Sequence, residues 1–67
     1  MTADRVRTLL LRGDNLLKSG RPERVQRALE AFEEAREAAQ DPDVSPQVRE
    51  LVDRRLEALR QMAESDQ

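Results

Sequence analysis

Apolar residues recur every three or four positions along three stretches of the chain, and two short breaks separate these stretches. Such spacing places the apolar side chains on one face of an α-helix. The breaks are KSGRP at 18–22 and DPDVSP at 41–46. Glycine often ends a helix, and a residue that precedes proline avoids helical backbone angles. The pattern therefore predicts three helices, over about residues 3–19, 22–40 and 46–63.

The breaks also carry residues that suit helix ends. Gly20 fits the left-handed position after the first helix, and Pro22 fits the first turn of the second. Ser45 followed by Pro46 is a typical start of a helix, here the third. No segment alternates apolar and polar residues with period two, so we expect no strand. We expect an all-α fold whose acidic tail, residues 64–67, is frayed.

Large apolar side chains are scarce for a single helical domain that spans residues 1–67. Besides Met1 there are nine Leu, five Val, Phe32 and Met62, and no Cys or His could supply a disulfide or a Cys/His metal site. A domain of this size needs very regular helix packing or a partner surface. We therefore expect self-association to complete the fold, as a homodimer or a larger homo-oligomer.

The tripeptide Arg12-Gly13-Asp14 is best known as a cell-adhesion signal, which requires a protruding loop. Here it lies inside the first predicted helix. At 100° per residue, Gly13 falls in the middle of the apolar stripe, and its two neighbours lie on the flanks. A glycine inside a helix costs about 1 kcal/mol but lets another helix approach closely. We predict that Gly13 serves packing and that the tripeptide is not an adhesion motif.

The second predicted helix offers a complementary surface of small residues. Ala28 and Ala35 belong to a stripe of alanines, and Phe32 lies on a bulky edge beside it. Small residues opposite a glycine permit a tight antiparallel pair of helices. We predict that the first two helices form a hairpin, with Gly13, Ala28, Phe32 and Ala35 as packing residues.

Four glutamates occupy the far side of the second helix: Glu30, Glu33, Glu34 and Glu37. Like charges at this spacing cost a few tenths of a kcal/mol each, so they do not serve helix stability. They form either a solvated face or an acidic surface for a basic partner.

Two further residues are candidates for an interface. Leu11 projects away from the apolar stripe of its helix. Arg55 lies between Leu51 and Met62 on the shoulder of the third helix's stripe. Its stem either covers apolar surface while the guanidinium reaches water, or the guanidinium pairs with a carboxylate in an interface. The candidate interface residues are Leu11, Arg55, Glu30, Glu33, Glu34 and Glu37.

Residues 6–42 resemble one tetratricopeptide repeat. The family pattern W-x2-L-G-x2-Y…A-x3-F…P can be laid on Leu9-x2-Arg12-Gly13-x2-Leu16, Ala28-x3-Phe32 and Pro42. The third helix is similar to the capping helix of that family. The resemblance implies a helical hairpin and a role in protein–protein interaction. Arg12 stands where the family has Leu, both aromatics of its first helix are missing, and its peptide-binding positions are not matched.

Composition argues against several classes of function. Without His, Cys, Tyr or Trp, acid–base chemistry would fall to carboxylates, which are spread over helix faces; we expect no enzyme, no catalytic residues, no metal and no cofactor. An isoelectric point near 5.1 and a single aromatic residue argue against nucleic acid. No apolar run exceeds three residues, so we expect no membrane contact and no signal peptide. Because MTADRVRT has no apolar core that could act as a signal peptide, we expect a cytoplasmic protein. Eleven Arg against one Lys, with no Ile, suggest a bacterial source.

We therefore expect a small protein–protein interaction module, an adaptor or scaffold, that binds a partner protein or a second copy of itself. One alternative is a structural or assembly subunit that folds only within a larger complex. Another is a small helical dimeric regulator, although the arginines of the third helix are each offset by nearby acids.

Overall fold

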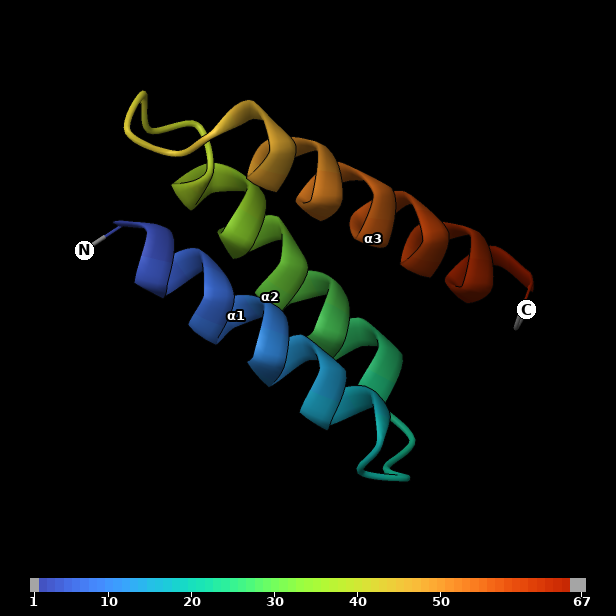
Figure 1. Cartoon of the computed structure of the whole chain (residues 1–67). Coiled ribbons are helices and arrows are strands. Elements are labelled where there is room, and N and C mark those ends of the chain that lie inside the picture. Colours follow the sequence, from blue (N-terminus) through green and yellow to red (C-terminus); the bar gives the residue numbers. More distant parts are fainter. Residues whose placement is uncertain (1, 66–67) are drawn as a thin grey trace.

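The computed structural model describes residues 2–65, and three α-helices make up most of this range (Figure 1). They are α1 (Thr2–Leu17), α2 (Arg24–Ala38) and α3 (Pro46–Ser65). The described residues contain no strand, which confirms the all-α prediction. The first two helices form an antiparallel hairpin, and α3 runs back along α2 in the direction of α1 (Figure 1). The middle helix α2 therefore packs against both of the others.

The turn between α1 and α2 differs in detail from the prediction. The first helix ends at Leu17, because the Ser19 amide and hydroxyl both donate to the Leu16 carbonyl, at 3.1 and 2.7 Å. Gly20 then adopts the predicted left-handed conformation, with φ of 75°. Helix α2 begins at Arg24 and not at Pro22, which lies in a preceding turn.

That turn spans residues 21–24 and is closed by a hydrogen bond from the Arg24 amide to the Arg21 carbonyl, 3.1 Å long. Pro22 occupies its second position, where the fixed φ of proline is favoured. The same property that suits the first turn of a helix therefore serves a turn just before it. The helix itself ends at Ala38, two residues before the predicted end.

The third helix begins at Pro46, as predicted, and the Ser45 hydroxyl accepts a hydrogen bond of 3.4 Å from the Val48 amide. The prediction that the tail frays from residue 64 is wrong for residues 64–65, which are helical. The Ser65 hydroxyl donates to the Gln61 carbonyl at 3.0 Å. Residues 66–67 of the predicted tail lie outside the described residues.

The core lies where α2 meets the other two helices. Val44, in the loop between α2 and α3, is among its most buried members, with 1% of its surface exposed. Sequence reasoning gave this loop residue no packing role. Its carbonyl accepts a hydrogen bond of 3.0 Å from Arg49, which ties the loop to α3. The buried apolar residues are Val6, Leu9, Leu10, Ala28, Ala31, Phe32, Ala35, Ala39, Val44, Val52, Leu56 and Leu59.

Gly13 lies where α1 packs tightly against α2. It is buried, and a Cβ atom placed on it would lie only 2.7 Å from Cδ1 of Phe32 and even closer to Cε1. The ring of Phe32 thus occupies the space that a side chain at position 13 would need. The Arg12-Gly13-Asp14 tripeptide lies in the middle of a helix with its glycine against α2, and no loop displays it.

Candidate interaction surfaces

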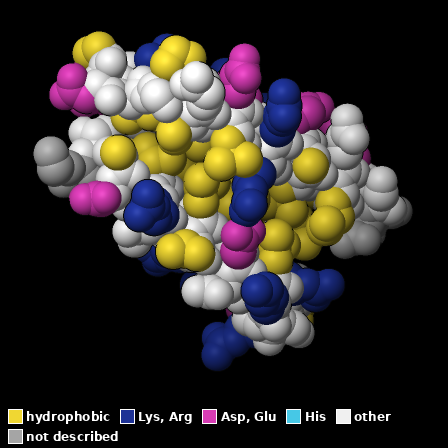
Figure 2. Space-filling model, viewed as in Figure 1, with side chains coloured by type: hydrophobic (Ala, Val, Ile, Leu, Met, Phe, Trp, Pro, Cys, Tyr) yellow, Lys and Arg dark blue, Asp and Glu magenta, His cyan; other side chains and the backbone are white. Residues whose placement is uncertain are grey.

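One surface of interest lies between α1 and α3. The Arg55 guanidinium of α3 donates a hydrogen bond of 2.7 Å to the Asp14 carboxylate of α1, and the two side chains are 43% and 35% exposed. In Figure 2, hydrophobic side chains gather over the middle of the molecule, between the positions of α1 and α3 in Figure 1, and a basic and an acidic side chain lie side by side among them. We call this surface the α1–α3 face and define it by Asp14, Leu51, Arg55, Ala58 and Met62.

Helix α3 carries its part of the α1–α3 face as a stripe of exposed residues. Leu51, Arg55, Ala58 and Met62 follow one another at intervals of four, three and four, which aligns them along one side of the helix. Leu51 is 45% exposed and Met62 is 50% exposed, although both are large and apolar. A second stripe, around Leu56, is buried against the rest of the domain. Two adjoining sides of α3 are therefore apolar, and only one is covered.

The guanidinium of Arg55 is paired with a carboxylate, but this pair lies within the chain, whereas the sequence-based alternative placed it in an interface. The carboxylate belongs to Asp14 of the same chain, 41 positions away in the sequence. This ion pair joins α1 to α3, which otherwise touch each other much less than each touches α2. The pair is half-exposed, so it contributes little to stability, but it leaves neither charge uncompensated on the apolar face.

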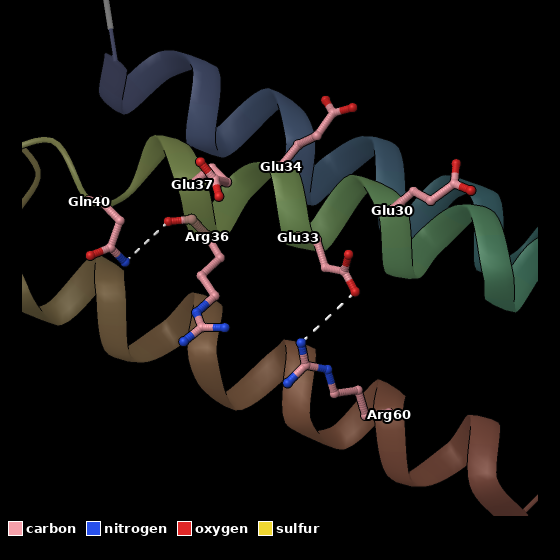
Figure 3. A pocket seen from close by; sticks show the side chains of 7 residues that line it. All are labelled: Glu30, Glu33, Glu34, Arg36, Glu37, Gln40 and Arg60. Carbon is pink, nitrogen blue, oxygen red and sulfur yellow. Dashed lines mark hydrogen bonds and ion pairs between the residues drawn. The ribbon is translucent and has the colours of Figure 1, made fainter.

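The four glutamates of α2 are exposed, and they line a broad open groove of about 800 Å³ next to α3 (Figure 3). The groove is not uniformly acidic. Arg60 of α3 approaches Glu33 to 3.9 Å, and Arg36, which also lines the groove, lies 3.6 Å from Asp53. The residues that line the groove are Glu30, Glu33, Glu34, Arg36, Glu37, Gln40 and Arg60.

Leu11 lies apart from both of these surfaces. It is 56% exposed on the outer side of α1 and borders a shallow depression of about 440 Å³. The depression is lined by residues of α1 and by Ser19, with no contribution from α3. The structure therefore does not bring Leu11 together with Arg55 or with the glutamates.

Sequence reasoning missed two members of the α1–α3 face. Ala58 was overlooked, although its position in the spacing from Leu51 to Met62 is visible in the sequence. Asp14 was placed on the flank of the α1 stripe, but nothing local indicates that it pairs with Arg55. Only the packing of α1 beside α3 brings those two charges together.

The described residues offer no group of three or more His, Cys, Asp or Glu side chains placed to hold a metal ion. Across the same residues, no helix combines the length and the apolar character needed to span a membrane. No protein-family model, no curated protein and no solved structure matches the chain. A functional assignment therefore rests on the chain's own surfaces.

Proposed function

We propose that this chain is a small protein–protein interaction module that docks through its α1–α3 face. The observation that carries the proposal is the pair of exposed apolar side chains, Leu51 and Met62, on either side of the Arg55–Asp14 ion pair. Large apolar residues left half-exposed on the same face of a small domain are typical of a binding surface.

The chemistry of the α1–α3 face resembles that of the central part of a protein interface. Such regions are apolar and are enriched in Met and Arg, and a charge that is buried there is paired with an opposite charge. Arg55 is already paired with Asp14 at 2.7 Å, so covering it would not leave an isolated charge. The resemblance of residues 6–42 to a tetratricopeptide repeat supports the same class of function.

The acidic groove on α2 is the weaker candidate. Its glutamates face solvent, and Arg60 and Arg36 bring positive charge into the groove. A basic partner would have to compete with these arginines. On the α1–α3 face, a partner could cover Leu51 and Met62 without displacing charged residues of this chain.

Site-specific photocrosslinking tests the proposal. A photoreactive benzophenone amino acid would replace Leu51 or Met62 in the full chain, Glu34 in the acidic groove, or Gln26 on the exposed side of α2 as the control. Circular dichroism would show that each variant keeps its helix content. After illumination in cells, we expect discrete adducts from positions 51 and 62 and none from position 26.

Two results would contradict the proposal. Adducts that are equally strong at position 26 would mean that crosslinking is unspecific. Adducts at position 34 alone would mean that the acidic groove is the interaction surface and that the α1–α3 face is not.

A further inference from the structure

We propose that the α1–α3 face binds a second copy of this chain, with the two α3 helices antiparallel and in contact along Leu51, Arg55, Ala58 and Met62. The inference rests on the proposed function, because it names the occupant of the same face. The evidence is the order of side chains along α3, which is complementary to itself when the helix is reversed.

The geometry of this pairing follows from the positions of the four residues. A two-fold axis between residues 56 and 57 places Leu51 opposite the partner's Met62, and Arg55 opposite the partner's Ala58. Each exposed apolar side chain thereby meets another one. Each long arginine meets a residue with almost no side chain, which leaves room for its stem and for the bound Asp14 carboxylate. Two identical surfaces that meet in this way form a closed dimer.

Charge complementarity favours the antiparallel direction over the parallel one. In a parallel pair, Arg55 would lie level with the partner's Arg55, and like charges that face each other are destabilising. In the antiparallel pair the levels of the two Arg55 residues are about 4.5 Å apart along the helices, and each guanidinium keeps its own Asp14 carboxylate. In the antiparallel pair, Arg54 lies at the edge of the contact, between the levels of the partner's Glu57 and the partner's Gln61. A carboxylate and an amide oxygen are both acceptors for its guanidinium. The two-fold axis repeats this favourable arrangement at the other end of the contact.

Arg55 can be covered in such a dimer without a large electrostatic penalty. A buried charge is costly mainly when its partner is missing. Here Asp14 of the same chain accepts a hydrogen bond of 2.7 Å from the guanidinium before any second copy arrives. The ion pair therefore remains intact when Ala58 of the partner subunit covers it.

The expected dimer is small and reversible. A standard interface takes about 800 Å² from each partner, which is about a sixth of the 5035 Å² surface of this chain. The contact stripe from Leu51 to Met62 is only about 16 Å long. We therefore expect the buried area of each partner to be no larger than this standard value. We therefore expect a concentration-dependent equilibrium rather than a permanent dimer.

Disulfide trapping tests the pairing directly, because the chain has no native cysteine. Two full-length variants, Leu51→Cys and Met62→Cys, would be mixed in equal amounts under reducing conditions and then oxidised. A disulfide needs Cα atoms within about 7 Å, whereas two copies of Cys at position 51 would lie about 16 Å apart along the antiparallel helices. Mass spectrometry separates the three covalent products, since the two variants differ in mass.

We expect the crossed product, position 51 joined to position 62, to predominate among the covalent dimers, because only this pair of positions comes within disulfide distance in the antiparallel arrangement. Random collision would make the crossed product about half of the covalent dimer. A mixture of Gln26→Cys with Met62→Cys serves as the control for random collision. Predominance of the product that joins position 51 to position 51 would overturn the antiparallel arrangement. A product distribution and rate equal to those of the control would overturn the specific contact.

The non-covalent dimer is tested by Ala58→Lys, which places a bulky cation against the partner's Arg55. Gln26→Lys is the matched control, since it adds the same charge on the far side of α2. By sedimentation equilibrium, we expect the unmodified chain and the control to approach twice 7.7 kDa with rising concentration. We expect Ala58→Lys to remain at 7.7 kDa over the same range while its circular dichroism is unchanged.

An unmodified chain that stays monomeric at millimolar concentration, or an Ala58→Lys variant that dimerises as well as the control, would overturn the inference. The photocrosslinking result separates this failure from failure of the proposed function. A monomer whose positions 51 and 62 crosslink to a different protein would retain the interaction module and exclude self-pairing. A monomer with no adduct at either position would exclude both.

Discussion

The contact between Gly13 and Phe32 permits a sharp test of the packing. In an exposed helix, Gly→Ala is stabilising by about 1 kcal/mol, because glycine has the poorest helix propensity after proline. At position 13 the new methyl group would lie 2.7 Å from Cδ1 of Phe32 and closer still to Cε1. Phe32 is 2% exposed, so the ring has no free space into which it can move.

Two opposing terms therefore decide the outcome of Gly13→Ala. Overpacking of a filled core costs about 1–3 kcal/mol, and the gain in helix propensity offsets about 1 kcal/mol of it. We expect a net loss of up to about 2 kcal/mol in the free energy of unfolding, which lowers the Tm by several degrees in a domain of this size. Urea unfolding followed by circular dichroism at 222 nm, at one fixed low protein concentration, measures this change.

A double-mutant cycle isolates the clash from other effects of the substitution. In a Phe32→Leu background the steric conflict is removed, so the same Gly13→Ala change should become neutral or stabilising by up to about 1 kcal/mol. The difference between Glu50→Ala and Glu50→Gly, at an exposed position of α3 outside the α1–α3 face, calibrates the propensity term in this protein. If Gly13→Ala stabilises the original chain by the full propensity value, then α1 does not pack on Phe32 at this position and the described register is wrong.

Three further predictions concern single residues. Val44→Ala should lower the free energy of unfolding by about 2 kcal/mol, because a loop side chain with 1% exposure loses its core contacts; an unchanged urea midpoint would contradict its burial. Asp14→Asn should cost at most about 1 kcal/mol, and less at 1 M NaCl, because its ion pair with Arg55 is half-exposed; a larger loss, or one insensitive to salt, would contradict this. Gly20→Ala should cost about 1 kcal/mol through its left-handed backbone, although no atom would touch the new Cβ; a gain in Tm would contradict that conformation.

Local properties of the sequence were sufficient to predict the three helices and the role of Gly13. The apolar spacing of three and four depends only on the geometry of a helix, and it does not require knowledge of the partner helix. Gly20 has the backbone conformation expected for it, and Pro46 begins α3 as expected. Both effects are local, because glycine permits a positive φ and the proline ring fixes φ near the helical value. Pro22 would suit the first turn of α2 and the turn just before α2 equally well. The sequence alone therefore could not show that it lies in the turn.

Features that depend on two distant segments were decided only by the tertiary structure. Val44 has no periodic neighbours in its loop, and it becomes a core residue because it joins the buried cluster to which all three helices contribute. Asp14 and Arg55 meet because α1 and α3 both pack on α2 and run in the same direction (Figure 1). The exposure of Leu51 and Met62 is likewise a property of the whole fold, since their spacing alone would equally suit a buried stripe. The sequence by itself therefore determined which segments are helical, because helix formation is local. The tertiary structure decided which apolar side chains remain uncovered, because burial depends on what the rest of the chain places beside them.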